Sequence, residues 1–171
     1  MTQGKPFLTS LNNSVVFRNQ IINSALDFCK KELDSWLKKM EGKTKERVVH
    51  CHNNLTIDHY VKNNTEAFIS WDNYTVDTPV LDLYNLYQKD YLKYDFSNFL
   101  ETYNNKFILT DEEKKLLFIL ISMPFKIELK ENEFNNTKKV NNLLTYIYKT
   151  ENLIRPYYSP KNPKQEHNLE N

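Results

Sequence analysis

Apolar residues recur at helical spacing through the first quarter of the chain. Within residues 15–40, Lys, Glu and Asp separate an apolar series that consists of Ile22, Ala25, Leu26, Cys29, Leu33, Trp36, Leu37 and Met40. This period of about 3.6 predicts a helix with one buried stripe. Gly42 predicts its end, because glycine readily adopts the left-handed conformation that closes many helices.

The next part of the chain has a strand-like pattern. Val48 and Val49 form a short apolar step, and the segments DHYVK (58–62) and EAFISW (66–71) read as two short strands. Asn63 and Asn64 lie between them, and asparagine accepts the positive φ angles of tight turns. The pattern therefore predicts a β-hairpin.

After the hairpin the pattern is helical. Pro79 suits the first turn of a helix that contains VLDLYNLYQ, and residues 96–103 form a second short helix. Thr110 and Glu113 form a capping box, which opens a helix that contains LLFILI and ends at Pro124. We expect a last helix, capped by Asn136 or Thr137, whose apolar side holds Val140, Leu143, Leu144, Ile147 and Tyr148.

These elements predict a mainly α (α+β) domain with one small β-hairpin in its middle. A chain of 171 residues fits one domain, which would bury roughly 70% of its unfolded surface. We expect an N-terminal extension over residues 1–14, a folded domain over 15–157, and a mobile polar tail over 158–171. His167 falls in this tail, where we expect it to be solvated.

Composition narrows the class of function. The 23 Lys and Arg residues balance 22 Asp and Glu, so no strong field favours nucleic acid as a partner. The N-terminus has no apolar leader, and the longest apolar run, residues 116–121, is too short to span a membrane. We expect a soluble, cytoplasmic protein without disulfides, in which Cys29 is a core residue. The chain has only two glycines, Gly4 and Gly42, and they lie far apart, so it contains no glycine-rich phosphate loop.

Histidines gather in one segment. RVVHCHNNLTIDHYV, residues 47–61, holds three of the four histidines and one of the two cysteines. A zinc site from His50, His52 and His59 is one interpretation, although no C-x-x-C or H-E-x-x-H spacing supports it. The other interpretation makes His52 a packing residue that holds the loop backbone from below.

Three motifs follow one another here: HNNLTIDH (52–59), ISWD (69–72) and DTPVLDL (77–83). Together with the long helix before them, they resemble the C-terminal lobe of the aminoglycoside phosphotransferase and choline kinase superfamily, which is related to protein kinases. We expect the bacterial spore-coat branch. The resemblance extends over residues 19–91, and beyond them only helical character continues it. It implies a kinase-like C-lobe over residues 15–157.

The resemblance assigns roles to single positions. His52 and Asn54 occupy the catalytic positions in degenerate form, because family members have at position 54 an Asp that accepts a hydrogen bond from the substrate hydroxyl. His59 and Ser70 stand where the family has magnesium ligands. Asp82 matches the family's aspartate that hydrogen-bonds to the catalytic-loop backbone. For Asp77 we expect only a structural role, as a helix cap before Pro79.

These replacements weaken phosphotransfer chemistry. The Asn54 amide accepts no proton at neutral pH, so a general-base factor of roughly 10²–10⁴ would be lost. Mg²⁺ prefers charged oxygen ligands, and His59 and Ser70 supply none. Phosphoryl transfer depends mostly on such charge neutralisation. Asp72 could restore a ligand if FISW is a strand, because it would share a face with Ser70, and Asp58 adjoins the loop position.

Three functional hypotheses follow. The first is a degenerate phosphotransferase-like domain, a pseudokinase, that binds a protein partner or a separate N-terminal lobe and needs no cofactor. The second is a small-molecule phosphotransferase lobe that uses ATP and Mg²⁺, with Asp72, Asp58 and His59 at the metal and another chain as nucleotide-binding lobe. The resemblance places that lobe before the long helix, where only about fifteen residues stand. The third is a helical interaction domain without kinase ancestry.

Overall fold

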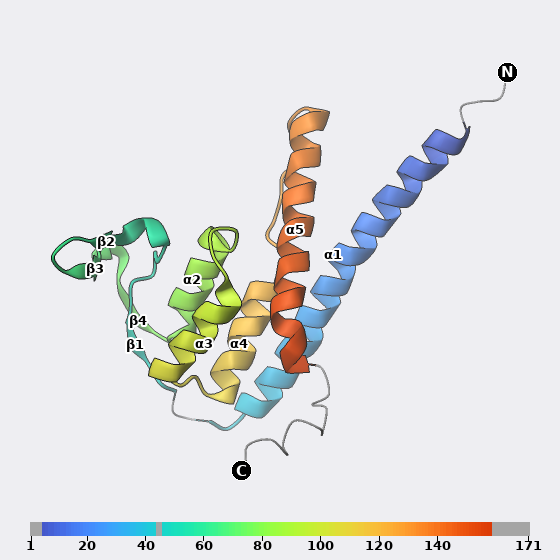
Figure 1. Ribbon diagram of the computed structural model, residues 1–171. Helices are drawn as coiled ribbons and strands as arrows, with labels where there is room; N and C mark the ends of the chain where they lie inside the picture. The colour runs from blue at the N-terminus through green and yellow to red at the C-terminus, as the bar shows by residue number, and fades with distance from the viewer. Residues whose placement is uncertain (1–4, 44–45, 159–171) are drawn as a thin grey trace, which may run out of the picture.

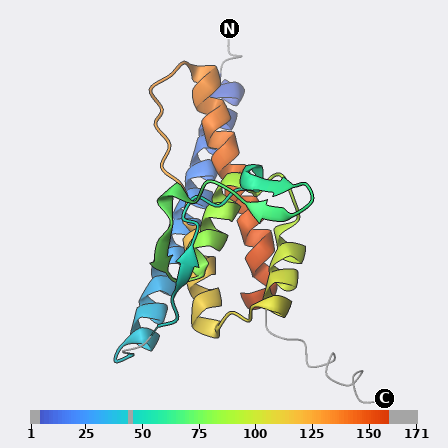
Figure 2. The same ribbon diagram turned by 90° about the vertical axis from the view of Figure 1, so that its left-hand side faces the viewer.

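The computed structural model describes the backbone of residues 5–43 and 46–158, and the side chains from residue 15 onward within those ranges. The described part of the chain is mainly α-helical, with two small antiparallel sheets of two strands each (Figure 1). The predicted mainly α (α+β) class is therefore confirmed. The sheets lie on one side of the helical body, and the N-terminal part of the first helix projects on the other (Figures 1 and 2).

The first helix, α1 (Lys5–Met40), is longer than predicted. It begins at Lys5 instead of residue 15, because Pro6 suits a first helical turn and no glycine interrupts the residues that follow. It ends where predicted, with Gly42 at φ 78°. Its C-terminal half lies along α4, where the Trp36 indole donates to the Glu112 carbonyl over 3.0 Å.

The other helices surround a common core. They are α2 (Val80–Asp90), α3 (Phe96–Lys106), α4 (Asp111–Ser122) and α5 (Glu133–Tyr158). The Tyr87 and Tyr146 side chains are buried at their centre, where Tyr87 bonds to the Thr150 hydroxyl at 2.8 Å and Tyr146 donates to the Ile121 carbonyl at 2.6 Å. Burial raises the pKa of Tyr87 to about 12, so this phenol stays neutral and can donate.

The capping box of α4 is confirmed, since Thr110 and Glu113 satisfy each other's backbone N–H groups. α4 ends at Ser122, two residues before Pro124. None of the helices in residues 5–43 and 46–158 has both the length and the apolar character to cross a membrane.

The predicted start of the last helix is wrong, and its predicted apolar side is correct for Leu143 and Ile147, which are buried, but wrong for Tyr148. α5 begins at Glu133, before Asn136 and Thr137, because the Asn132 side chain accepts the Asn135 N–H at 2.9 Å and takes the capping position. Tyr148 is 64% exposed, and the buried side consists of Leu143, Tyr146, Ile147, Thr150, Leu153 and Ile154. Residues 159–171 of the predicted tail, with His167, lie outside the described residues.

The predicted hairpin is present, with altered bounds. β2 (Tyr60–Lys62) pairs with β3 (Glu66–Phe68), so the connection has three residues, 63–65. Neither Asn63 nor Asn64 has positive φ, so the predicted turn geometry is wrong. A second pair was not predicted: β1 (Val49–Cys51) runs antiparallel to β4 (Thr75–Asp77). Two 3₁₀ turns, η1 (Ile57–His59) and η2 (Trp71–Asn73), flank the hairpin.

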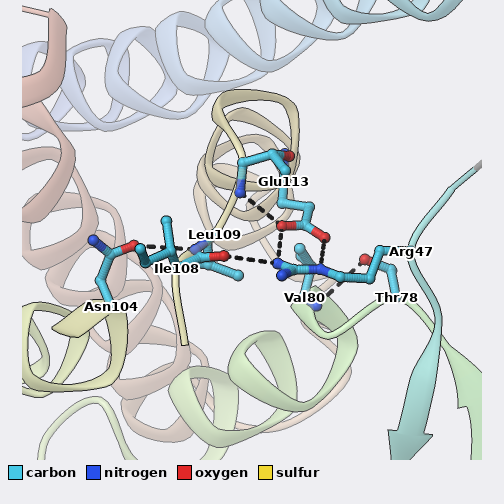
Figure 3. A network of polar contacts seen from close by, with 8 residues as sticks. Arg47, Thr78, Val80, Asn104, Ile108, Leu109 and Glu113 are labelled. Atoms are coloured by element: carbon cyan, nitrogen blue, oxygen red, sulfur yellow. Dashed lines mark hydrogen bonds and ion pairs between the residues drawn. The ribbon is translucent and has the colours of Figure 1, made fainter. Parts of the chain in front are cut away.

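An arginine joins the segment before β1 to the start of α4 (Figure 3). The Arg47 guanidinium forms a bidentate ion pair with Glu113, donates to the Ile108 carbonyl at 3.0 Å, and lies 4.2 Å from the centre of the Phe107 ring. The same Glu113 carboxylate accepts the Thr110 N–H at 2.7 Å. The network fixes the entry into β1, and β1 leads directly into the histidine loop.

Candidate functional site

One carboxylate holds the first residues of the loop between β1 and β2. The Asp82 side chain, in the first turn of α2, accepts the backbone N–H of His52 at 2.7 Å and that of Asn53 at 2.8 Å. Asn53 itself adopts a left-handed conformation, with φ 57°. This bidentate contact is the one that the family resemblance implies for Asp82.

His52 is packed beneath the loop, with 1% of its surface exposed. Its Nε2 lies 2.7 Å from the Ile69 carbonyl. A carbonyl only accepts, so Nε2 donates, and the ring ties the start of the loop to the residue after β3. The ring also contacts Trp71 and stacks on His59, with centroid distances of 4.8 and 5.4 Å. These contacts are those of a packing residue.

The three histidines do not converge. The His50 side chain is exposed and lies beside Tyr74, the residue before β4, with ring centroids 6.5 Å apart, while His52 and His59 stack on each other. In the described part of the chain, no three His, Cys, Asp or Glu side chains are grouped so that they could hold a metal ion. Neither the zinc set of His50, His52 and His59 nor the set of Asp58, Asp72 and His59 is brought together in this arrangement.

A lysine binds the side chain of Asn54, the residue that the family resemblance places at a catalytic position. The Asn54 amide oxygen accepts a hydrogen bond from the ammonium group of Lys89, which stands in the last turn of α2. The pair thus places a positive charge where the family resemblance implies an acidic group. Lys89 was not identified from the sequence, because a lysine near a helix end usually remains in solvent and favours the helix dipole.

The far end of the loop is held by a buried carboxylate. Asp90 is 1% exposed, and its Oδ2 accepts the Thr56 hydroxyl at 2.7 Å and the Ile57 N–H at 2.8 Å. Its Oδ1 lies 2.9 Å from the Lys93 ammonium. Burial raises the pKa of Asp90, but the hydrogen bonds from Lys93, Ile57 and Thr56 outweigh it and leave the pKa below its ordinary value. Asp90 therefore stays charged.

Lys93 also engages the exposed acid of the loop. Both oxygens of Asp58 lie within hydrogen-bond distance of its ammonium, at 2.9 and 2.8 Å. Hydrogen bonds to Asp58 and Asp90 raise the pKa of Lys93, so the cation is retained. Asp58, which was considered as a metal ligand from the sequence, is instead one of two acids that share a lysine.

The strand that was expected to direct Asp72 ends too early. β3 stops at Phe68, Ser70 adopts a left-handed conformation with φ 66° and ψ 50°, and Asp72 belongs to the 3₁₀ turn η2. The expected alternation of side chains from Ser70 to Asp72 is therefore wrong, because it requires extended backbone. The Asp72 side chain forms no hydrogen bond or ion pair with other residues in the described ranges.

Two neighbouring residues have structural roles. Asp77 ends β4 and accepts the Thr78 N–H at 2.7 Å, whereas the capping position of α2 is Pro79, so the expected helix-cap role is wrong. The Cys51 thiol is buried and donates to the Thr78 carbonyl at 3.3 Å. Burial, followed by the charges of Asp82 and Asp77, raises the pKa of Cys51.

Comparison with protein-family models gives no match, and neither the curated proteins nor the solved structures provide one.

Proposed function

We propose that the chain is a kinase-like C-terminal lobe that has lost phosphotransfer and acts as a binding or scaffold module. The order of elements supports this: a long helix, β1, a histidine loop, the hairpin, β4 paired with β1, and a helix whose Asp82 holds the loop. The hairpin between Asp58 and Trp71, whose absence would have favoured a helical domain without kinase ancestry, is present.

The observation that carries the proposal is the charge around the loop. Asp82 is engaged by backbone N–H groups, Asp90 by the loop and Lys93, and Asp58 by the same lysine. Lys89 adds a second ammonium on Asn54. A divalent ion bridging a triphosphate needs charged oxygen ligands, and here Asp58, Asp82 and Asp90 already have partners.

The β region offers a surface for a partner. Nine large apolar side chains between positions 48 and 76 are at least one-third exposed: Val48, Ile57, Tyr60, Val61, Phe68, Ile69, Trp71, Tyr74 and Val76. Soluble monomers seldom leave so many apolar side chains uncovered in one region. The surface suits a protein partner, including a separately encoded N-terminal lobe, better than a free sugar or amine.

Calorimetric titration of the full chain with Mg-ATP tests the proposal. We expect only the heat of dilution, for the wild type and equally for Asn54→Asp, because Lys89 would neutralise the new carboxylate. Micromolar binding accompanied by phosphate release would overturn it. Titration with ATP in the presence of EDTA is the matched control, since heat that persists there would indicate metal-independent binding by the lysines.

A second candidate is a phosphotransferase lobe completed by another chain that binds ATP and Mg²⁺. The feature that favours it is Asp72, a carboxylate near the loop without a partner in the described ranges. In a reconstituted pair, Asp72→Ala would abolish phosphate transfer under this candidate. Under the leading proposal no transfer occurs in the pair, and the substitution changes only stability.

A further inference from the structure

α1 and α5 diverge toward the N-terminus of each helix (Figure 1). A groove lies between them. Its volume is about 540 Å³, its far wall is formed by α5 between Ile147 and Tyr158, and Ser122 of α4 also lines it. The α1 wall consists of Phe17, Gln20, Ile21, Ser24, Ala25 and Phe28. Their spacing of three and four residues is that of one helix face, so the groove follows α1 for about three turns.

The groove is apolar and contains one unsatisfied polar group. The Ser122 side chain is 7% exposed, and its hydroxyl has no partner within the described ranges. The acid on the α5 wall, Glu151, is paired with Arg155 of the next turn at 2.9 Å. The groove therefore favours an occupant with an apolar face and few charges, and it offers that occupant one hydrogen bond.

The chain itself contains a segment of this chemistry. Among the 21 residues from 6 to 26, Arg18 is the only charged one, although charged residues make up 26% of the chain. These residues belong to α1, and the side chains of Val15, Val16 and Phe17 are 52%, 54% and 63% exposed. A helix so poor in charge gains most of its stability from packing, and the Phe17 side chain lacks such packing in the single chain.

We propose that the groove is filled by α1 of a second copy of the chain. Two copies related by a two-fold axis would place each α1 in the groove of the other, and the two α5 helices would flank them as in an antiparallel four-helix bundle. Ser24 and Ala25, which are small, lie near the middle of the α1 wall and permit a close approach. One contact, made twice, thus fills both grooves and covers the exposed Phe17 side chain of each copy.

The second copy suits the groove because the α1 face that it would present, with Phe17, Ile21 and Ala25, is the same uncharged face that lines the groove. The inference does not depend on the loss of phosphotransfer, since the groove and the histidine loop lie on different sides of the helical body (Figures 1 and 2).

Sedimentation velocity of the full chain over a wide range of concentrations tests the proposal. We expect a reversible dimer for the wild type and at least ~100-fold weaker dimerisation for Ile21→Glu, because the carboxylate would be buried without a partner. Leu26→Glu is the matched control: Leu26 lies on the opposite side of α1, is 45% exposed, and loses a side chain of the same size. It should dimerise as the wild type does.

Disulfide trapping provides an independent measurement that does not rely on a destabilising charge. In an antiparallel contact centred on the α1 wall, positions 21 and 24 of the two copies face each other. Mild oxidation should therefore convert Ile21→Cys/Ser24→Cys into a covalent dimer. The control Asn23→Cys/Leu26→Cys, on the other side of the helix, should stay monomeric in denaturing electrophoresis.

A wild type that is monomeric at every concentration would overturn the proposal and would leave the groove to another protein or to an apolar small molecule. Equal weakening by Ile21→Glu and Leu26→Glu, or equally efficient trapping of both cysteine pairs, would also contradict it.

Discussion

The Asp82 carboxylate lies 2.7 Å from the backbone nitrogen of His52, a residue 30 positions earlier in the chain. The contact crosses from the first turn of α2 to the end of β1, and the same carboxylate accepts the next N–H, that of Asn53. A side chain that satisfies two consecutive backbone donors determines the backbone conformation between them. The start of the histidine loop is therefore set by α2.

Asp82→Asn should loosen this part of the loop. The amide has one acceptor oxygen, so one backbone N–H would face the new NH₂ group and lose its partner. We expect a loss of about 1–3 kcal/mol in the free energy of unfolding, measured by chemical denaturation, with faster hydrogen exchange at His52 and Asn53. Asp72→Asn removes an acid that has no partner in the described ranges. It should leave the free energy of unfolding and the exchange rates unchanged. Similar effects of the two substitutions would contradict this role of Asp82.

Acid should destabilise the protein in part through Asp90. Its pKa is lower in the folded chain than the ordinary value of 3.8, so its stabilising contribution is complete above that value and disappears as pH falls through the folded pKa. Asp90→Asn can keep the contacts to Thr56 and Ile57 only by turning its NH₂ group towards Lys93. We expect a loss of about 1–3 kcal/mol at neutral pH and a shallower fall in stability below pH 4.

Denaturation curves from neutral pH to about pH 2 would measure this dependence. Asp58→Asn is the control, because Asp58 binds the same lysine from a side chain that is 71% exposed. If the free energy of unfolding fell as steeply with acid in Asp90→Asn as in the wild type, other carboxylates would be the cause of the acid destabilisation.

Arg47→Gln should destabilise the junction between β1 and α4. The substitution removes the bidentate pair with Glu113 (Figure 3). It also removes the contact of the guanidinium with the Phe107 ring. We expect a decrease of about 1 kcal/mol in the free energy of unfolding, measured by thermal or chemical denaturation.

Lys62→Gln is the matched control for Arg47→Gln. It breaks the Lys62–Glu66 ion pair, whose side chains are 69% and 56% exposed, and should change stability very little. Equal losses for both substitutions would mean that the Arg47 network adds no more than an ordinary surface ion pair.

Both thiols should be unreactive in the folded protein. Cys29 and Cys51 are buried, and burial raises the pKa of Cys29 to about 11. Because the thiolate is the reacting species, we expect modification by a disulfide reagent at pH 8 to be at least ~100-fold slower than in denaturant. Rapid labelling of either residue without denaturant would indicate that α1 or β1 opens readily.

Local signals made much of the helical structure predictable. The Thr110–Glu113 capping box and Gly42 each act over a few residues, so their effect can be read without knowing the fold. The pairing of β1 with β4 could not be predicted in this way. It joins Cys51 to Thr75 through strands of three residues, which are too short to show an alternating pattern.

The same distinction applies to the site. The position of Asp82 followed from the family resemblance, whereas Asp90 gave no signal, because an acidic residue is rarely buried unless it is paired. Its partners Thr56 and Ile57 lie 34 and 33 positions earlier in the chain. Lys89 was missed for a similar reason, since its acceptor, Asn54, is brought to it only by the fold.

α2 carries both anchors of the histidine loop, with Asp82 in its first turn and Asp90 at its last residue. They lie eight positions apart, so the two attachment points stand about 12 Å apart along the helix. A ligand that displaces α2 would move residues 52–57 together with the helix, because both ends of the segment are bonded to α2. A displacement of the loop on binding would therefore be transmitted through α2 to α3 and α5, which share its core.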